Sequence, residues 1–251
     1  MSGLNTLFVG QQLIELEEIN STSNYAAELL KAGQMAEGTV IMAHSQTQGR
    51  GQRGNTWESS KGQSLTFSLI LYPKFLKISE QFYLSEAIAM AVIDSLKELN
   101  INAQIKWPND IYVGDKKLGG ILIENSINGN SLSTSIIGIG LNINQTNFPE
   151  NLPNPTSLKL LTNKEFNIRN FLEHLLGFIE KRFLQLRSLQ FRELKKEYLA
   201  SLYRMDGYHS FQLKENKISA RIKDVLPDGR LELTDSEEKT FIVNFQEIRF
   251  L

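Results

Sequence analysis

The chain has 251 residues, of which 41% are hydrophobic and 22% are charged, and this length and composition are typical of a globular protein with one large and one small domain. A formal net charge of −1 provides no general basic field for nucleic acid or anionic lipid, and the absence of cysteine excludes disulfides, thiolate metal sites and cysteine nucleophiles. The N-terminus lacks the pattern of a signal peptide, and no stretch reaches the roughly 18 apolar residues of a membrane span. We therefore expect a soluble cytoplasmic protein that binds neither nucleic acid nor membrane.

The first half of the chain predicts helices and buried strands. A helix is expected over about residues 23–31, ending at Gly33. Its N-cap is one of three adjacent hydroxyl residues, Ser21, Thr22 and Ser23. Apolar runs rich in β-branched residues predict buried strands over 38–43 and 64–71, with a glycine-rich polar stretch between them. Apolar residues at helical spacing then predict a long helix over 80–99 that lies on the sheet.

The next part of the chain carries hairpin signals. Strands over 111–113 and 117–124 are expected to be joined by the turn at 114–116. The second of these strands is expected to be joined to a strand over 133–144 around Asn128–Gly129. Asn and Gly both accept positive φ, so this turn is predicted to be of type I′.

Helical patterns resume over about 169–203, and the residues that follow predict four or five short strands with a hairpin turn at Asp228–Gly229. The order α, β, β, α and then antiparallel β indicates an α/β or α+β fold with a mixed sheet flanked by helices. We expect a main domain over 1–206 and a small β-barrel domain over 207–251.

The segment with the most chemical information is Gly49–Gly54, which fits the pattern G-x-G-x-x-G. A dinucleotide-binding interpretation fails, because a polar stretch and a strand follow instead of a helix, and positions 69–71 contain no carboxylate for a ribose. Glycines interleaved with Arg50 and Arg53 are typical of a loop that holds a phosphate or carboxylate. Trp57 offers a flat face for a heterocycle. The alternative is a solvated surface loop.

Two further segments contain candidate ligand-binding residues. In the run Lys-Trp-Pro-Asn-Asp, the polar residues Asn109 and Asp110 begin a strand, where they either cap a turn or bind a polar ligand. Lys117 precedes two glycines within a strand, so it either binds a carboxylate or phosphate or is a solvated lysine at a strand end. Alternate glycines over 138–144 indicate close ligand approach or room for the long helix, and Asn142 is a candidate hydrogen-bonding residue.

Taken together, these segments resemble the biotin–protein ligase family in its own motif order. The matching positions are Ser21-Thr22, Gln46, 49–59, 106–110, 117–124 and 138–144. The resemblance implies a class II synthetase-like catalytic domain and a small SH3-like C-terminal barrel. It also implies two half-reactions. The carboxylate of biotin attacks the α-phosphate of ATP to give biotinyl-5′-AMP and pyrophosphate, and a lysine of a biotin carboxyl carrier protein then displaces AMP.

Carried over to matching positions, the resemblance implies a role for each site residue. The ureido ring of biotin would meet Ser21, Thr22, Ser23 and Gln46. The residues that close over the carboxylate and α-phosphate would be Arg50, Gly51 and Gln52. Lys117 would bridge both substrates and, with Arg50, stabilise charge in catalysis, while Asp110 would orient the acceptor lysine. Backbone lining biotin would come from Gly119, Gly120 and Ile121, and the adenylate would contact Trp57, Asn109 and Asn142.

The chain departs from the family pattern at three positions. Gln52 and Asn55 stand where members often have arginine, and Ser23 stands where they often have asparagine. The missing cation at position 52 predicts looser retention of the adenylate. Because glycine resists ordering without a ligand, residues 49–57 are expected to be mobile in the free protein.

The remaining expectations concern cofactors and partners. The three histidines are far apart, so no metal site built from protein side chains is expected, and Mg²⁺ would arrive with ATP. About 20 residues precede Ser21, too few for the DNA-binding winged helix of regulatory members, so we expect the form without it, as a monomer or weak homodimer. The alternatives are a lipoate ligase or octanoyl transferase, a non-catalytic biotin sensor and a DNA-binding regulator.

Overall fold

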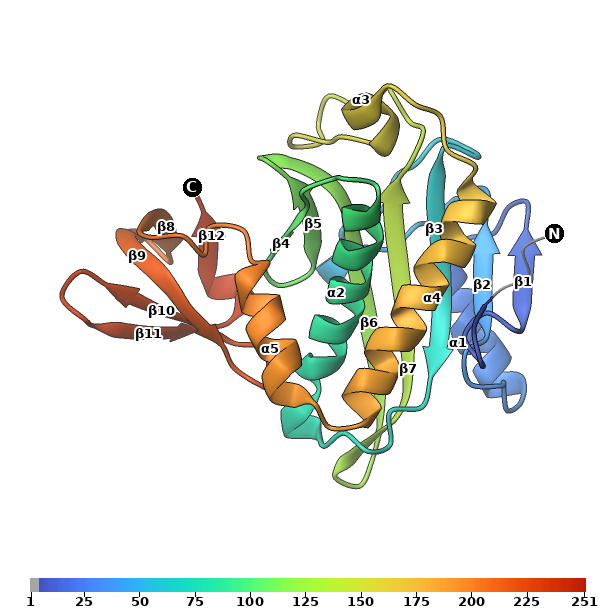
Figure 1. The fold of residues 1–251 in the computed structure, drawn as a ribbon, viewed down its shortest axis with the longest axis horizontal. Helices are drawn as coiled ribbons and strands as arrows, with labels where there is room; N and C mark the ends of the chain where they lie inside the picture. Colours follow the sequence, from blue (N-terminus) through green and yellow to red (C-terminus); the bar gives the residue numbers. More distant parts are fainter. Residues whose placement is uncertain (1–4) are drawn as a thin grey trace.

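The computed structural model describes residues 5–251, which form two sheets and the helices around them (Figure 1). The larger sheet has seven strands in the order β1-β2-β3-β7-β6-β5-β4. These strands are β1 Leu13–Leu16, β2 Val40–Ala43, β3 Ser64–Leu71, β4 Gln104–Lys106, β5 Asp110–Val113, β6 Lys116–Asn128 and β7 Ser131–Asn142. β1 and β2 are parallel and the other neighbours are antiparallel, so the predicted mixed sheet is confirmed.

The two faces of this sheet are covered unequally. The helices are α1 Thr22–Ala32, α2 Phe82–Glu98, α3 Leu158–Thr162, α4 Ile168–Arg187 and α5 Phe191–Ala200. In Figure 1, α2 and α4 lie in front of the sheet and α1 lies behind it. Because strand side chains alternate, Val40 and Leu69 pack in the core under α2 and α4, whereas Ile41 and Ile70 pack around Ala26 of α1. The short α1 covers only part of its face, which leaves room there for a ligand.

Most of the predicted elements are confirmed. The helix expected over 23–31 is α1, which Ser21 caps by accepting a hydrogen bond from the backbone N–H of Asn24. The strand over 64–71 is β3, and the helix over 80–99 is α2. The helical patterns expected over 169–203 form two helices, α4 and α5. The short elements β1, β4 and α3 were not predicted, because three to five residues are too few for a period to stand out.

The predicted type I′ turn at Asn128–Gly129 is wrong. Asn128 is the last residue of β6 and pairs with Ser131, so the central turn residues are Gly129 and Asn130. Gly129 has a φ of 61°, but Asn130 is absent from the described residues with positive φ. A type I′ turn needs positive φ at both central positions, whereas positive φ at the first alone fits type II′.

The C-terminal part forms a five-stranded antiparallel sheet in the order β11-β10-β9-β8-β12. Its strands are β8 His209–Leu213, β9 Asn216–Val225, β10 Leu231–Asp235, β11 Thr240–Val243 and β12 Ile248–Phe250. The predicted turn at Asp228–Gly229 connects β9 to β10, and Gly229 has a φ of 95°. The expected division at residue 207 falls between α5 and β8 and stays a prediction; residues 1–4 of the expected main domain lie outside the described residues.

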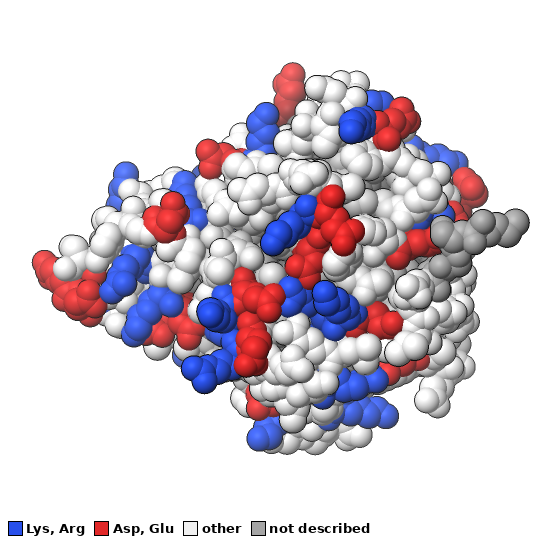
Figure 2. All heavy atoms as spheres, viewed as in Figure 1, with Lys and Arg blue, Asp and Glu red and all other residues white. Residues whose placement is uncertain are grey.

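The surface carries charges of both signs. Figure 2 shows basic and acidic side chains interspersed over the face that carries α2 and α4, with no field of a single sign. Arg182 of α4, for example, lies between Asp94 and Glu197, at 2.7 and 2.6 Å. In the part of the chain that the structure describes, no helix has the length and apolar character needed to cross a membrane.

A buried ion pair joins the two sheets through α5. Lys195 Nζ lies 2.8 Å from Glu86 Oε1 of α2 and 3.4 Å from Asp224 Oδ1 of β9, and it also donates to the carbonyl of Val225. Glu86 is fully buried, and this burial raises its pKa from the ordinary 4.5 to about 7, although Lys195 opposes the shift. The junction between α2, α5 and the C-terminal sheet therefore includes a carboxylate whose pKa is raised to about 7.

We expect Glu86→Gln to remove a pH dependence of stability. Glu86 binds its proton more tightly in the folded chain, so its contribution to the free energy of unfolding falls as pH rises from 4.5 to about 7 and then stays level. As pH rises from about 5 to 8, the wild type should lose on the order of 2 kcal/mol of unfolding free energy relative to Glu86→Gln. Urea unfolding at both pH values measures this shift, and equal pH dependence of the two proteins would contradict it. Glu238→Gln, at an exposed carboxylate, is the control.

Candidate active site

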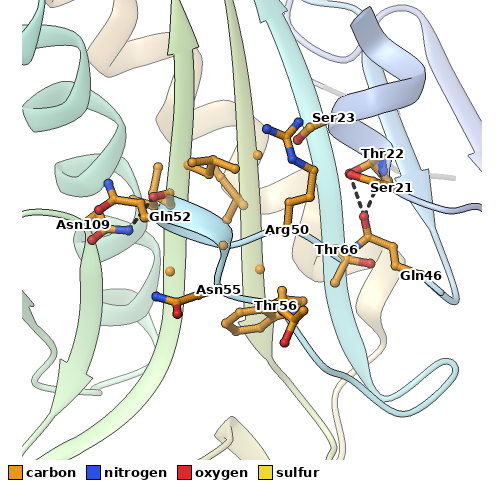
Figure 3. A pocket seen from close by; sticks show the side chains of 18 of the residues that line it. Ser21, Thr22, Ser23, Gln46, Arg50, Gln52, Asn55, Thr56, Thr66 and Asn109 are labelled. Carbon is orange, nitrogen blue, oxygen red and sulfur yellow. Dashed lines mark hydrogen bonds between the residues drawn. The ribbon is translucent and has the colours of Figure 1, made fainter. Parts of the chain in front are cut away.

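A cavity opens on the partly covered face of the large sheet, beneath residues 46–57, which we call the glycine loop (Figure 3). Most of the predicted site residues meet there. Those on its wall are Ser21, Thr22, Ser23, Gln46, Arg50, Gly51, Gln52, Trp57, Asn109, Asp110, Lys117, Gly120 and Ile121. The fold thus brings α1, the glycine loop and the strands β5 and β6 together around one space.

The floor of the cavity consists of small residues in rows across the strands. One row of paired residues is Thr66, Gly140, Gly120 and Asp110, and the next is Ser68, Gly138 and Leu122. Paired residues on neighbouring strands point to the same face of a sheet. Because each row contains glycine, the backbone of the strands is accessible from the cavity there. Sequence reasoning missed Thr66 and Ser68, although polar residues at every second position of an apolar strand were a usable signal.

The glycines of β7 make room for the glycine loop and α1. A Cβ atom at Gly140 would lie 2.5 Å from the ring of Trp57, and one at Gly138 would lie 2.9 Å from Ser23 Oγ. The alternative that these glycines make room for the long helix is wrong, because α2 covers the opposite face. Nε1 of Trp57 is buried and has no partner among the described residues, so it is a donor that a ligand could satisfy.

One end of the cavity is a neutral hydrogen-bonding wall. The backbone N–H and hydroxyl of Thr22 both donate to Gln46 Oε1, at 2.8 and 3.2 Å, as Figure 3 shows. Ser68 Oγ donates to Thr22 Oγ1 at 2.8 Å and lies 3.0 Å from Ser23 Oγ. Hydroxyl groups can both donate and accept, so this chain of side chains suits an uncharged ligand group that carries N–H and C=O together.

The start of β6 places a cation in the cavity. Lys117 Nζ lies 2.7 Å from Asp110 Oδ1, and both side chains are partly exposed. Gly120 lies beside this pair, since a Cβ atom there would be 3.4 Å from the carboxylate and 3.9 Å from the ammonium group. Asn109 makes two hydrogen bonds to the backbone of Ile121. Its side-chain Nδ2 donates to the carbonyl of Ile121 at 2.8 Å, and its own carbonyl accepts from the backbone N–H of Ile121 at 2.9 Å. These bonds hold the Asn-Asp corner against β6.

Arg50 reaches from the glycine loop toward α1. Its Nη1 donates to Asn24 Oδ1 at 2.9 Å and to Glu124 Oε2 at 3.0 Å, and its Nη2 donates to Glu124 Oε1. In Figure 3 the guanidinium group lies beside Ser23, at the neutral end of the cavity. Asn24 and Glu124 were not among the predicted site residues. Glu124 follows Gly120 and Leu122 at every second position of β6. Residues at this spacing point to the same face of a sheet, so the sequence did contain a signal that Glu124 faces the cavity side.

Two predicted site residues are not on the cavity wall. Gly119 points to the opposite face from Gly120, where it packs closely against Leu141. Asn142 is buried, and its Nδ2 donates to the carbonyl of Thr156 at 3.0 Å. Strand alternation explains the first placement, and the bond to Thr156 shows that the amide of Asn142 is already engaged inside the protein.

The C-terminal sheet also contributes to the cavity. Phe245 lies on its wall and contacts the ring of Trp107, whose Nε1 donates to the carbonyl of Gly229 at 3.0 Å. Gln52 lies on the wall at the same junction. Within residues 5–251, no group of three or more His, Asp or Glu side chains is arranged to hold a metal ion.

We expect Gly140→Ala to displace Trp57. The added methyl group would overlap the indole ring, and overpacking of this kind costs about 1–3 kcal/mol of stability. Chemical unfolding and the fluorescence of Trp57 in a Trp107→Phe background measure the effect. Gly177→Ala is the matched control, because nothing lies within 4 Å of the new methyl group in the middle of α4. There the substitution should stabilise the helix by up to about 1 kcal/mol. Unchanged stability and fluorescence in Gly140→Ala would contradict the prediction.

Comparisons with known proteins agree with this arrangement. Residues 15–142 match the Biotin/lipoate A/B protein ligase family. The bifunctional ligase/repressor BirA of Bacillus subtilis is 36% identical over 185 residues, which are 72% of this chain and 56% of that protein. The biotin–[acetyl-CoA-carboxylase] ligase of Mycobacterium tuberculosis is 28% identical over 86% of this chain and 76% of its own length. The chain thus spans only about half the length of the Bacillus relative.

A solved structure extends the similarity to the whole fold. The biotin protein ligase from Aquifex aeolicus in complex with biotin and ATP has a TM-score of 0.80 and 28% sequence identity. The match covers 96% of this chain and 100% of that one, so both the large sheet and the C-terminal sheet are included. The expected fold class is therefore confirmed. On the sequence match to more than half of its residues, the chain belongs to the biotin/lipoate A/B protein ligase family.

Proposed function

We propose that this protein is a biotin–protein ligase that activates biotin with ATP and transfers it to a lysine of a biotin carboxyl carrier protein. The observation that carries the proposal is a single cavity with a neutral hydrogen-bonding wall at one end and Lys117 at the other. Biotin has the same polarity, with a ureido ring at one end and a carboxylate at the other. The Aquifex protein of similar fold is described in complex with biotin and ATP, which supports the assignment.

In this proposal the ureido ring lies against the hydroxyl wall. Thr22 and Ser23 offer hydroxyl groups at the N-terminus of α1, Ser68 of β3 supports both of them from behind, and Gln46 is held in place by its two bonds to Thr22. The small floor residues, such as Gly138, let the ring lie on the sheet backbone. Serine at position 23 can still hydrogen-bond where family members often have asparagine.

The adenylation step needs positioning and charge stabilisation rather than a nucleophile from the protein. The carboxylate of biotin attacks the α-phosphate of ATP, and pyrophosphate leaves. Lys117 exchanges Asp110 for the ligand's carboxylate and phosphate oxygens, and it stabilises the charge that develops there. Arg50 and the backbone of the glycine loop cover the ligand, and Nε1 of Trp57 supplies a further donor to the adenylate.

Transfer follows when the acceptor lysine attacks the mixed anhydride and AMP leaves. We assign Asp110 to the acceptor amine, because it lies 2.7 Å from Lys117 and is free to receive a new cation once Lys117 binds the anionic ligand. Asn109 braces this corner through Ile121, and Asn142 braces the wall behind Trp57 through Thr156. Mg²⁺ would enter with the phosphates of ATP.

A lipoate ligase or an octanoyl transferase is the second candidate, because the description of the family names lipoate beside biotin. The hydroxyl wall favours biotin. The ureido group of biotin can exchange hydrogen bonds with the hydroxyl groups of Thr22 and Ser23, whereas a dithiolane ring or an alkyl tail has no N–H or C=O group that can do so.

The test is biotin-dependent exchange of pyrophosphate into ATP, with lipoate and octanoate in parallel. We expect exchange with biotin alone, and a loss of at least about 100-fold in Lys117→Met, because one cationic contact to the reacting phosphate is removed. Circular dichroism should show that the variant is folded, since Lys117 is partly exposed. Exchange with lipoate instead would assign the protein to the second candidate, and no exchange with any acid would remove the proposed activity.

We expect Gln52→Arg to retain the adenylate longer. Gln52 lies on the cavity wall where family members often have arginine, and a charge-assisted hydrogen bond to a phosphate would lengthen the half-life of bound biotinyl-AMP by about tenfold or more. Filter binding or a free-adenylate assay measures the half-life. Gln48→Arg is the matched control, because it adds the same charge to the glycine loop outside the cavity. An unchanged half-life in Gln52→Arg would contradict the prediction.

A further inference from the structure

Arg50 joins three separate segments of the protein. It belongs to the glycine loop, and its guanidinium group is held by Asn24 of α1 and Glu124 of β6. The two bonds to Glu124 are parallel, which is the strongest geometry for an arginine–carboxylate pair. The side chains of Arg50 and Glu124 are 39% and 37% exposed, so water can reach the pair and it can open and close.

Both ends of the glycine loop are anchored independently of this pair. Gln46 is bonded to Thr22, and Trp57 packs on Gly140 and donates from its backbone to Gly49 at 2.9 Å. Between these anchors, the side chain of Arg50 contacts both walls, α1 through Asn24 and β6 through Glu124. The position of the middle of the loop therefore depends on the contacts of its guanidinium group.

Arg50 also separates two hollows. It lines the candidate active site, and it lines a second, more open groove together with Gly51, Leu122 and Glu124. The Arg50–Glu124 pair lies where the two hollows meet. Opening the pair would therefore widen the connection between the cavity and the groove.

We propose that Glu124 and Asn24 are positioning residues that hold Arg50 across the cavity and so keep the glycine loop closed over the bound acid and its adenylate. The identity of the ligand rests on the proposed function, whereas the closing contacts do not. Neither residue needs to touch the reacting atoms. They act through Arg50, and their contribution appears in the rate at which ligand escapes.

A different role for Glu124 would be to compete with the ligand's carboxylate for Arg50. The geometry opposes this role, because the guanidinium group lies beside Ser23 and Asn24 at the neutral end, and Lys117 is the cation at the other end (Figure 3). The two roles predict opposite effects of removing the carboxylate. A closing contact predicts faster escape, and a competitor predicts tighter binding.

The experiment compares Glu124→Gln with the wild type. We expect biotinyl-AMP and biotin to dissociate about fivefold faster, the upper range for an exposed ion pair. The KM for biotin should rise, whereas pyrophosphate exchange at saturating biotin should stay within about twofold, because the reacting groups are unchanged. Added salt should speed release more in the wild type than in Glu124→Gln, because the Arg50–Glu124 pair is screened only in the wild type, whereas the contact of Lys117 with the anionic ligand is screened in both.

Matched variants separate this role from a general effect on folding. Glu37→Gln removes the carboxylate of another Arg–Glu pair, Arg187–Glu37 at 2.7 Å, which lies outside the two hollows, and it should leave release unchanged. Asn24→Ala should give a smaller increase in the release rate. Glu124→Asp keeps the charge and should fall between Glu124→Gln and the wild type.

Two outcomes overturn the proposal. Slower release or a lower KM for biotin in Glu124→Gln would make Glu124 a competitor for Arg50. Release from Glu124→Gln at the same rate as from the wild type would show that the contact does not close the loop. If the wild type shows neither exchange nor biotin binding, the proposed function fails while the closing role is still tested without ligand. Limited proteolysis within residues 49–57 should then be faster in Glu124→Gln than in the wild type and in Glu37→Gln. Equal cleavage would overturn the closing role.

Discussion

The close approach of Trp57 to the backbone of β7 is the contact on which the site depends. An added methyl group at Gly140 would reach within 2.5 Å of the indole ring, so this position must lack a side chain for the glycine loop to lie on the sheet. The face is open to the loop because α1 is short and covers only part of it, while α2 and α4 bury the other face. A ligand bound here lies between the strands and the loop, and the backbone beneath it belongs to strands whose other side chains form the main core, among them Phe67 and Ile139.

Charge in the site is compensated before any ligand arrives. Arg50 is paired with Glu124, and Lys117 is paired with Asp110. Both pairs are partly exposed. At Lys117, exchanging Asp110 for a ligand carboxylate or phosphate avoids leaving a charge without a partner, while Arg50 stays paired with Glu124. The neutral wall of hydroxyl groups is buried instead, and its hydrogen bonds are internal. These two environments select a ligand with one uncharged polar end and one anionic end.

The C-terminal sheet is joined to the site by contacts of different kinds. Phe245 lines the cavity, Trp107 donates to Gly229, and the buried pair of Glu86 and Lys195 connects α2 to β9 through α5. The pKa of Glu86 is raised to about 7, so the electrostatic part of this junction responds to pH in the neutral range. The small sheet thus shares the main hydrophobic core, and the residues that follow its strand β11 contribute to the wall of the site.

The sequence by itself determined the local elements and the positions that carry chemistry. The apolar run over 64–71 and the helical spacing over 80–99 specify their elements through short-range periodicity, and the motif order from Ser21 to Asn144 indicated the family. Only the tertiary structure decided which side chains meet. Strand register placed Gly120 in the cavity and Gly119 on the opposite face, and it brought Ser68 under Thr22. The pairing of Arg50 with Glu124 spans 74 residues of sequence, and no local pattern encodes a contact of that range, because it depends on how the loop and β6 are packed.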